Sequence, residues 1–284
     1  MRLYDFAFGT MRGRRAEPPG RASGRRPEPQ VARPTPQSAT RTGSYLQPIL
    51  FLLVAAGLAL TAAPPLPAQD FSRSESREIL SRVDSLVSYP DRDFSAEYTV
   101  TQQRPGQGTS VTKLVMFRRD RTERYTILIT DPPADRGKGY LKIGSNLWLY
   151  DPADRRFTVT SAEERFQNSN ARNADFTQST LAEDYRIVGH ETAQLGAYET
   201  DVYDLEAVSD NVTFPEMRIW IDQDSLLRKF EDYSASGQHM RTTAIPSYRR
   251  LEDRYVPVHI VIQDELRGRE VDGRFRHERT VITV

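Results

Sequence analysis

From residue 94 onward, apolar and polar residues follow one another in short runs separated by turn residues such as Pro105-Gly106 and Pro132-Pro133. Turn signals at intervals of about 8 to 12 residues are typical of an antiparallel sheet that curls toward a barrel or a sandwich. We therefore predict one mainly β domain of about 10 to 11 strands. The strands are expected at residues 94–103, 111–118, 123–130, 185–191, 198–208, 216–221, 226–232, 238–248, 255–263 and 274–284, with two further short strands between 135 and 152.

Two other segments lack the period of strands. Residues 72–88 carry apolar residues at spacings of three and four, which is the period of one helix face, and Ser72 or Ser74 is placed to cap the start. Residues 161–184 do not show the alternation of apolar and polar residues that marks a strand, and we predict a loop-plus-helix crossing there. The chain thus offers an N-terminal helix and a helical insertion to cover the sheet.

Several predicted strands are apolar on both faces, for example residues 126–129, 147–150 and 258–262. A sheet with one solvated face alternates apolar and polar residues, so these strands require a cover on each face. We predict a curved, antiparallel, half-open β-barrel of the α+β type, with the N-terminal helix and the helical insertion across its concave face. The pattern leaves two alternatives for the space under this cover: a fully packed core, or a cavity that binds apolar ligands.

Residues 1–68 differ from the rest of the chain in composition. They carry nine Arg and three Asp or Glu, a net charge of +6, so the remaining residues carry −6 in a chain of zero net charge. Residues 1–44 are expected to be a disordered basic leader rich in Pro and Arg, or the product of a start codon assigned too far upstream. Residues 45–68 contain an apolar run followed by small residues, which predicts a signal peptide cleaved near Ala68. An uncleaved membrane anchor is the alternative for this segment. We expect residues 69–284 to form the exported domain.

Composition and motifs exclude several classes of function. The acidic exported part lacks the basic stripe typical of nucleic-acid-binding proteins. The chain has no cysteine, which excludes thiolate zinc sites, disulfides and a lipid-modified cysteine. The four histidines, His190, His239, His259 and His277, fall on different predicted strands and lack the spacing of a helical zinc site. We find no nucleophile motif or phosphate-binding glycine loop, and predict a protein that is not an enzyme and needs no metal or cofactor.

Three groups of motifs carry a family resemblance. The first comprises residues 136–141 (RGKGYL), 146–152 (NLWLYDP) and 155–157 (RRF). The second comprises residues 173–177 (NADFT) and 181–185 (LAEDY), and the third comprises residues 220–222 (WID) and 227–229 (LRK). Together they resemble the outer-membrane lipoprotein-sorting family, the LolA-like periplasmic carriers, over residues 72–284. The combination is more specific than any one motif.

The resemblance implies a half-open β-barrel whose hydrophobic, lidded cavity receives the acyl chains of lipoproteins and carries them through the periplasm to the outer membrane. It implies acylated lipoproteins or lipids as ligands, and an inner-membrane release complex and an outer-membrane acceptor as partners. We expect a monomer. The alternative function is an envelope protein with the same fold that senses lipids or lipoproteins and regulates a partner.

The resemblance also leads to hypotheses about individual residues. Those expected to line the cavity are Leu128, Leu141, Ile143, Trp148 and Tyr150, and those expected to form the lid are Phe166, Phe176 and Leu181. In the carrier family an arginine ties the lid down, and Arg124 and Arg136 are two candidates for that role. Ordinary core packing is the alternative for each of these positions.

Overall fold

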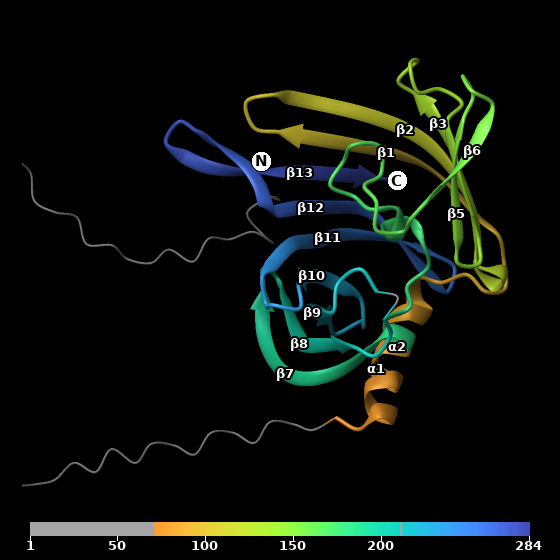
Figure 1. Cartoon of the computed structure of the whole chain (residues 1–284). Coiled ribbons are helices and arrows are strands. Elements are labelled where there is room, and N and C mark those ends of the chain that lie inside the picture. The colour runs from red at the N-terminus through yellow and green to blue at the C-terminus, as the bar shows by residue number, and fades with distance from the viewer. Residues whose placement is uncertain (1–70, 211) are drawn as a thin grey trace, which may run out of the picture. The chain divides into compact units, whose positions relative to one another are not determined.

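Thirteen strands form one antiparallel sheet in the part of the chain that the structure, a computed structural model, describes, which is residues 71–210 and 212–284 (Figure 1). The order across the sheet is β6-β5-β4-β3-β2-β1-β13-β12-β11-β10-β9-β8-β7, so β6 and β7 are its two edges and the sheet does not close. This is the predicted half-open barrel, and its strand number exceeds the 10 to 11 expected. The leader and the signal peptide predicted for residues 1–68 lie outside the described residues.

The helices and strands have the following bounds. The helical elements are α1 (Arg73–Val87), η1 (Asp120–Thr122), η2 (Asn173–Phe176) and α2 (Leu181–Asp184). The strands are β1 (Phe94–Arg104), β2 (Gly108–Arg119), β3 (Arg124–Asp131), β4 (Gly139–Ile143), β5 (Asn146–Asp151), β6 (Arg156–Thr160), β7 (Tyr185–Leu195), β8 (Tyr198–Ala207), β9 (Glu216–Asp222), β10 (Leu227–Tyr233), β11 (His239–Leu251), β12 (Arg254–Val271) and β13 (Arg274–Thr283).

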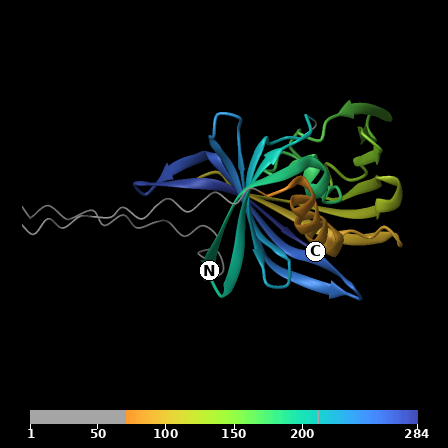
Figure 2. The same cartoon turned by 90° about the horizontal axis from the view of Figure 1, so that it is seen from below.

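The first helix, α1, begins at a complete capping box. The backbone N–H of Glu75 donates to the hydroxyl of Ser72 at 3.2 Å, and the backbone N–H of Ser72 donates to the carboxylate of Glu75 at 2.9 Å. These bonds satisfy two of the backbone donors that a helix start leaves free. Leu80 and Val83 are buried on the inner face of α1 and pack with side chains of β7, β8 and β9. Figure 2 shows α1, in orange, lying against the sheet. The helix therefore covers the β7 end of the sheet.

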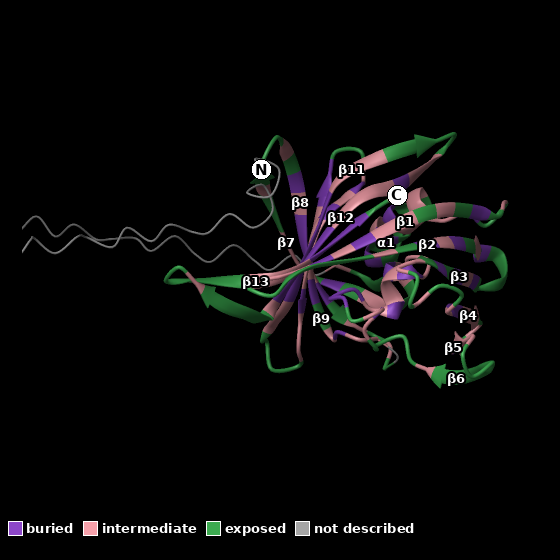
Figure 3. Ribbon diagram, turned by 90° about the horizontal axis from the view of Figure 1, so that it is seen from above, coloured by how far each residue is buried: buried purple, intermediate pink, exposed green. Residues whose placement is uncertain are grey.

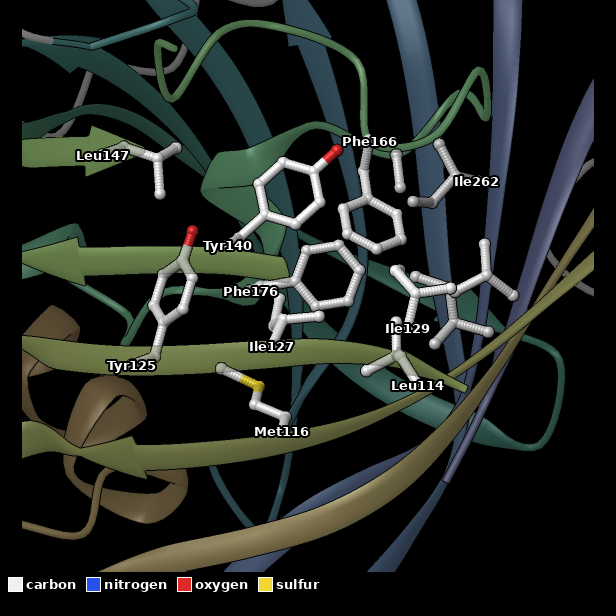
Figure 4. Close-up of a cluster of buried hydrophobic side chains, with 13 residues drawn as sticks. Leu114, Met116, Tyr125, Ile127, Ile129, Tyr140, Leu147, Phe166, Phe176 and Ile262 are labelled. Carbon is white, nitrogen blue, oxygen red and sulfur yellow. The ribbon is translucent and has the colours of Figure 1, made fainter. Parts of the chain in front are cut away.

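The insertion, residues 161–184, covers the other half of the concave face. Its two phenylalanines enter the core over β1 to β5, where the ring of Phe166 lies 5.0 Å from Tyr140 and 4.6 Å from Phe176 (Figure 4). The insertion is the predicted loop-plus-helix crossing, and its helical part consists of the short η2 and α2. Side chains replace helical hydrogen bonds here: Asn173 donates to the carbonyl of Ser161 at 2.8 Å.

Two strands differ from the prediction because their surroundings are solvated. The β12–β13 hairpin extends to Val271, beyond the predicted end at residue 263, as an exposed two-stranded ribbon (Figure 3). Polar residues on both faces of this ribbon gave no alternating pattern. The edge strand β6 pairs with β5 and is exposed along most of its length, so it too lacked a buried face by which a strand is recognised.

Candidate functional site

An apolar cavity of about 240 Å³ lies between α1, residues 174–179 of the insertion and the inner face of the sheet. Pockets for drug-sized ligands measure about 300 to 1,000 Å³, whereas an apolar cavity of about 150 Å³ already binds benzene. In this conformation the space therefore fits a small apolar group. The helix and the sheet contribute Val83, Val87, Tyr89, Phe94, Tyr98, Arg118, Leu226, Leu227, Phe230, Thr243, Ile245, Tyr248, Val256, Pro257, Ile260, Ile262 and Ile282 to its wall.

The wall of this cavity also contains polar groups, several of which have partners. Arg118 is paired with Asp120 at 2.7 Å, and its guanidinium lies 5.4 Å from the ring centre of Tyr89. The hydroxyl of Tyr89 donates to the carbonyl of Tyr255 at 2.9 Å, and burial raises the pKa of Tyr89 to about 12. The hydroxyl of Thr243 is buried and has no hydrogen-bond partner among the described residues. The wall is thus mainly apolar, and its two charged groups, Arg118 and Asp175, are each in an ion pair.

A buried ion-pair cluster, which we call the latch, ties the insertion to the sheet. Arg241 of β11 donates through Nη1 and Nη2 to both carboxylate oxygens of Asp175 in η2, at 2.8 and 2.9 Å. Its Nε donates to Asp232 of β10, which is only 1% exposed. Burial alone lowers the pKa of Arg241, but the two carboxylates outweigh it and raise the pKa. A bidentate pair of this kind is both strong and directional, so it fixes η2 over the cavity.

A second contact holds the far end of the insertion against α1. The carboxylate of Asp84 accepts hydrogen bonds from the backbone N–H groups of Leu181 at 3.2 Å and Ala182 at 2.9 Å. Burial raises the pKa of Asp84, and the two backbone donors act in the opposite direction because they favour the carboxylate. The segment that closes the cavity is therefore fixed at η2 by the latch and at α2 by Asp84.

The five strand residues predicted to line the cavity, Leu128, Leu141, Ile143, Trp148 and Tyr150, lie on the opposite face of the sheet. Along β3 the buried positions alternate with Leu128, which is 44% exposed. The register of β3, β4 and β5 places the other four on the same outer face. The hypothesis that they line the cavity does not fit this arrangement. Both faces of these strands are apolar, so the pattern alone did not show which face was inward.

The residues predicted for the lid are on the inner side. Phe176 lines the cavity, whereas Phe166 and Leu181 are buried in the adjoining clusters over β1 to β5 and β7 to β9. Neither candidate for the lid arginine holds the insertion: Arg124 is exposed, and Arg136 donates to the carbonyl of Thr130 within its own turn.

The arginine that ties the insertion down is Arg241, which sequence reasoning missed. One signal was present, because Arg241 is two and four residues before Thr243 and Ile245, which face inward and line the cavity. Side chains two residues apart in a strand share a face. A charged residue on the inward-facing side of a strand indicates a buried charge that needs a partner. The sequence does not identify Asp175 as that partner.

The described residues contain no group of three or more His, Cys, Asp or Glu that could hold a metal ion. None of the helices within residues 71–284 is long and apolar enough to cross a membrane. His190, His239 and His277 make local contacts, such as the 2.9 Å contact between His190 and Asp201 across β7 and β8.

Comparison with known proteins agrees with the fold. A family model whose description is "Uncharacterized protein" matches residues 121–281, more than half of the chain, and the chain belongs to that family. A search of curated protein sequences finds no match.

Solved structures give the fold a name. A LolA superfamily protein from Nitrosomonas europaea is 19% identical with a TM-score of 0.60, covering 73% of this chain and 90% of its own. A putative outer membrane lipoprotein-sorting protein domain from Vibrio parahaemolyticus is 17% identical with a TM-score of 0.63, covering 75% and 91%. A DUF1329 family protein from Desulfovibrio piger is 16% identical with a TM-score of 0.59, covering 74% and 90%. The chain therefore has the LolA-like lipoprotein-sorting fold, which confirms the resemblance at the level of the fold.

Proposed function

We propose that this protein is a periplasmic carrier that binds acyl chains of lipoproteins in the cavity beneath the insertion and delivers them to the outer membrane. The observation that carries the proposal is the apolar cavity closed by a segment that two polar contacts hold in place. It is a binding protein without a catalytic step. Residues 1–44 are its leader, residues 45–68 its signal peptide and residues 69–284 the carrier domain.

The physical need for such a cavity follows from the ligand. Each buried methylene of an acyl chain is worth about 0.8 kcal/mol, so a long chain in water is strongly disfavoured. Burial against aliphatic and aromatic side chains such as Ile260, Ile262 and Phe230 removes that cost without a covalent bond. Release at an acceptor then requires that the acceptor compete with the cavity by offering its own apolar surface to the acyl chain. An inner-membrane release complex and an outer-membrane acceptor are the partners that this cycle requires.

The present cavity is smaller than a long acyl chain needs, so binding requires the insertion to move. The latch and the contacts of Asp84 are polar, and they hold the insertion at two points along one segment. Opening at the latch lifts Phe176 from the cavity wall while α2 stays attached to α1. The insertion acts as the lid, and Arg241 is the residue that locks it.

A cavity-filling substitution tests the proposal. Ile260→Trp places a large ring in the cavity, and we expect the affinity for a fluorescent fatty-acyl probe to fall at least about tenfold, equivalent to about 1.4 kcal/mol. The matched control is Leu128→Trp, which adds the same ring on the outer face of the sheet and leaves binding unchanged. Equal binding by Ile260→Trp and the wild type contradicts the proposal, provided that circular dichroism shows both to be folded.

A further inference from the structure

A second, polar pocket of about 250 Å³ lies beside the latch, between residues 165–172 of the insertion and the β11 and β12 strands. Four arginines line it: Arg165, Arg172, Arg241 and Arg267. Asp264 is the carboxylate in the same wall. Acyl chains alone give no reason for such a concentration of positive charge. An apolar cavity of about 150 Å³ binds a benzene ring, so 250 Å³ is room enough for a phosphate or carboxylate group.

The charges in this pocket are only partly balanced. Asp264 is paired with Arg165, and Arg241 is paired with Asp175 and Asp232 in the latch. Arg172 and Arg267 form no ion pair with any residue that the structure describes. Guanidinium groups are the side chains best suited to phosphate and carboxylate, because their planar donors match the oxygens of these anions. Arg172 and Arg267 are therefore the two cationic side chains of this pocket that are available to pair with an anionic ligand.

Arg172 is held close to another arginine. The guanidinium groups of Arg172 and Arg241 lie 4.9 and 5.0 Å from the ring centre of the buried Phe214. Burial lowers the pKa of Arg172, and the nearby charges of Arg241 and Arg165 lower it further, while the carboxylates of Asp175 and Asp232 act in the opposite direction. Like charges that are brought together in a partly buried site repel one another, and a bound anion relieves that repulsion. The ring of Phe214 fixes the position of both groups.

Two more features shape the pocket. The pairing of β12 with β13 shifts between Gln263 and Gly268, and the carboxylate of Asp264 accepts from the backbone N–H of Arg267 at 2.9 Å. Such bulges redirect side chains, and this one places Arg267 at the pocket. Asn170, which is 5% exposed, lines the same pocket, and its Nδ2 has no hydrogen-bond partner within the described part of the chain.

The polar pocket adjoins the apolar cavity through the latch. Arg241 lines the polar pocket, and its bidentate partner Asp175 lines the apolar cavity. One ion pair is therefore the partition between an apolar space and a cationic one. We propose that the two spaces together bind an anionic amphiphile, with the acyl chain in the cavity and a phosphate or carboxylate head group against Arg172 and Arg267. This inference rests on the proposed function and specifies the class of ligand.

The test measures displacement of the fluorescent fatty-acyl probe by dodecyl phosphate, by dodecanol and by inorganic phosphate. For the wild type we expect dodecyl phosphate to bind at least about tenfold more tightly than dodecanol. One charge-assisted hydrogen bond is sufficient for a difference in affinity of that size. In Arg267→Gln this preference shrinks about tenfold while the affinity for dodecanol is unchanged. Arg172→Gln is the second variant. The matched control is Arg249→Gln, an exposed arginine of β11 outside both pockets, which keeps the full preference.

Each contrary outcome has a distinct meaning. If dodecanol displaces the probe as well as dodecyl phosphate does, the head-group site is refuted and the acyl cavity stands. If both arginine variants keep the wild-type preference, the assignment to this pocket is refuted. If inorganic phosphate binds as tightly as dodecyl phosphate, the pocket serves a free anion and the amphiphile proposal fails. If neither amphiphile displaces the probe, this inference fails, and failure of the probe itself to bind refutes the proposed function as well.

Discussion

The substitution Asp175→Asn should release the insertion while leaving the sheet intact. Asn has the size of Asp but no charge, and its amide group presents donors to the donors of Arg241, so both bonds of 2.8 and 2.9 Å are affected. The side chains of Arg241 and Asp175 are only 10% and 16% exposed, so solvent screening is weak. Arg241 retains Asp232, which keeps its charge compensated.

The expected magnitude follows from this burial. Removing one partner of a buried ion pair costs about 3 to 5 kcal/mol. Because Arg241 retains Asp232, we expect the loss to lie at the lower end, at about 3 kcal/mol. If the pair holds the insertion specifically, that free energy is lost from the local opening of residues 161–180, the part of the insertion before α2. Amide hydrogen exchange in this segment should then accelerate about 100-fold, because each factor of ten corresponds to about 1.4 kcal/mol.

The assay is hydrogen–deuterium exchange read by mass spectrometry, with urea unfolding as the companion measurement. The control is Glu206→Gln, which breaks the exposed pair with Arg186, where the side chains are 50% and 54% exposed. Exposed pairs are worth about 0 to 1 kcal/mol, so this variant should match the wild type. Wild-type exchange in residues 161–180 of Asp175→Asn would refute the reasoning, because the latch would then not be what holds the insertion closed.

Two further predictions concern stability. The pKa of Tyr89 in the folded state, about 12, lies above its usual value of 10.0, so the contribution of Tyr89 to stability is complete below pH 10 and is lost as the pH rises through about 12. Tyr89→Phe should therefore flatten the dependence of the urea-unfolding free energy on pH in this range. An unchanged slope would contradict this prediction. Removing the cap with Ser72→Ala should lower the free energy of unfolding by about 1 kcal/mol, whereas the exposed helix position Ser81→Ala should change it little, and equal effects would argue against the capping box.

Much of the fold was predictable because it depends on local pattern. The start of α1 at Ser72 follows from a capping serine ahead of apolar residues at helical spacing, and most strand positions follow from alternation between turns. The motifs at residues 136–157 also indicated the fold that the solved structures share. The exposed edge strand β6 and the solvated end of β12 were missed because neither buries a face.

The site was less predictable because it depends on contacts between distant segments. The choice of Leu128 and Trp148 as cavity residues failed because both faces of those strands are apolar, and only the register shows which one is inward. The latch joins Asp175 to Arg241, 66 residues apart, and nothing local marks that pairing. Phe176, which the resemblance assigned to the lid, lies in the cavity wall.

The most direct test of the central claim is mass spectrometry of the mature protein purified from the periplasm without detergent, followed by analysis of the extracted lipids. The account predicts that acylated species accompany the wild type and the Leu128→Trp control, and that they are lost from Ile260→Trp, whose added ring fills the cavity. A wild-type protein free of acylated species, or one whose bound lipid is unaffected by Ile260→Trp, would contradict the claim that the cavity beneath the insertion carries acyl chains.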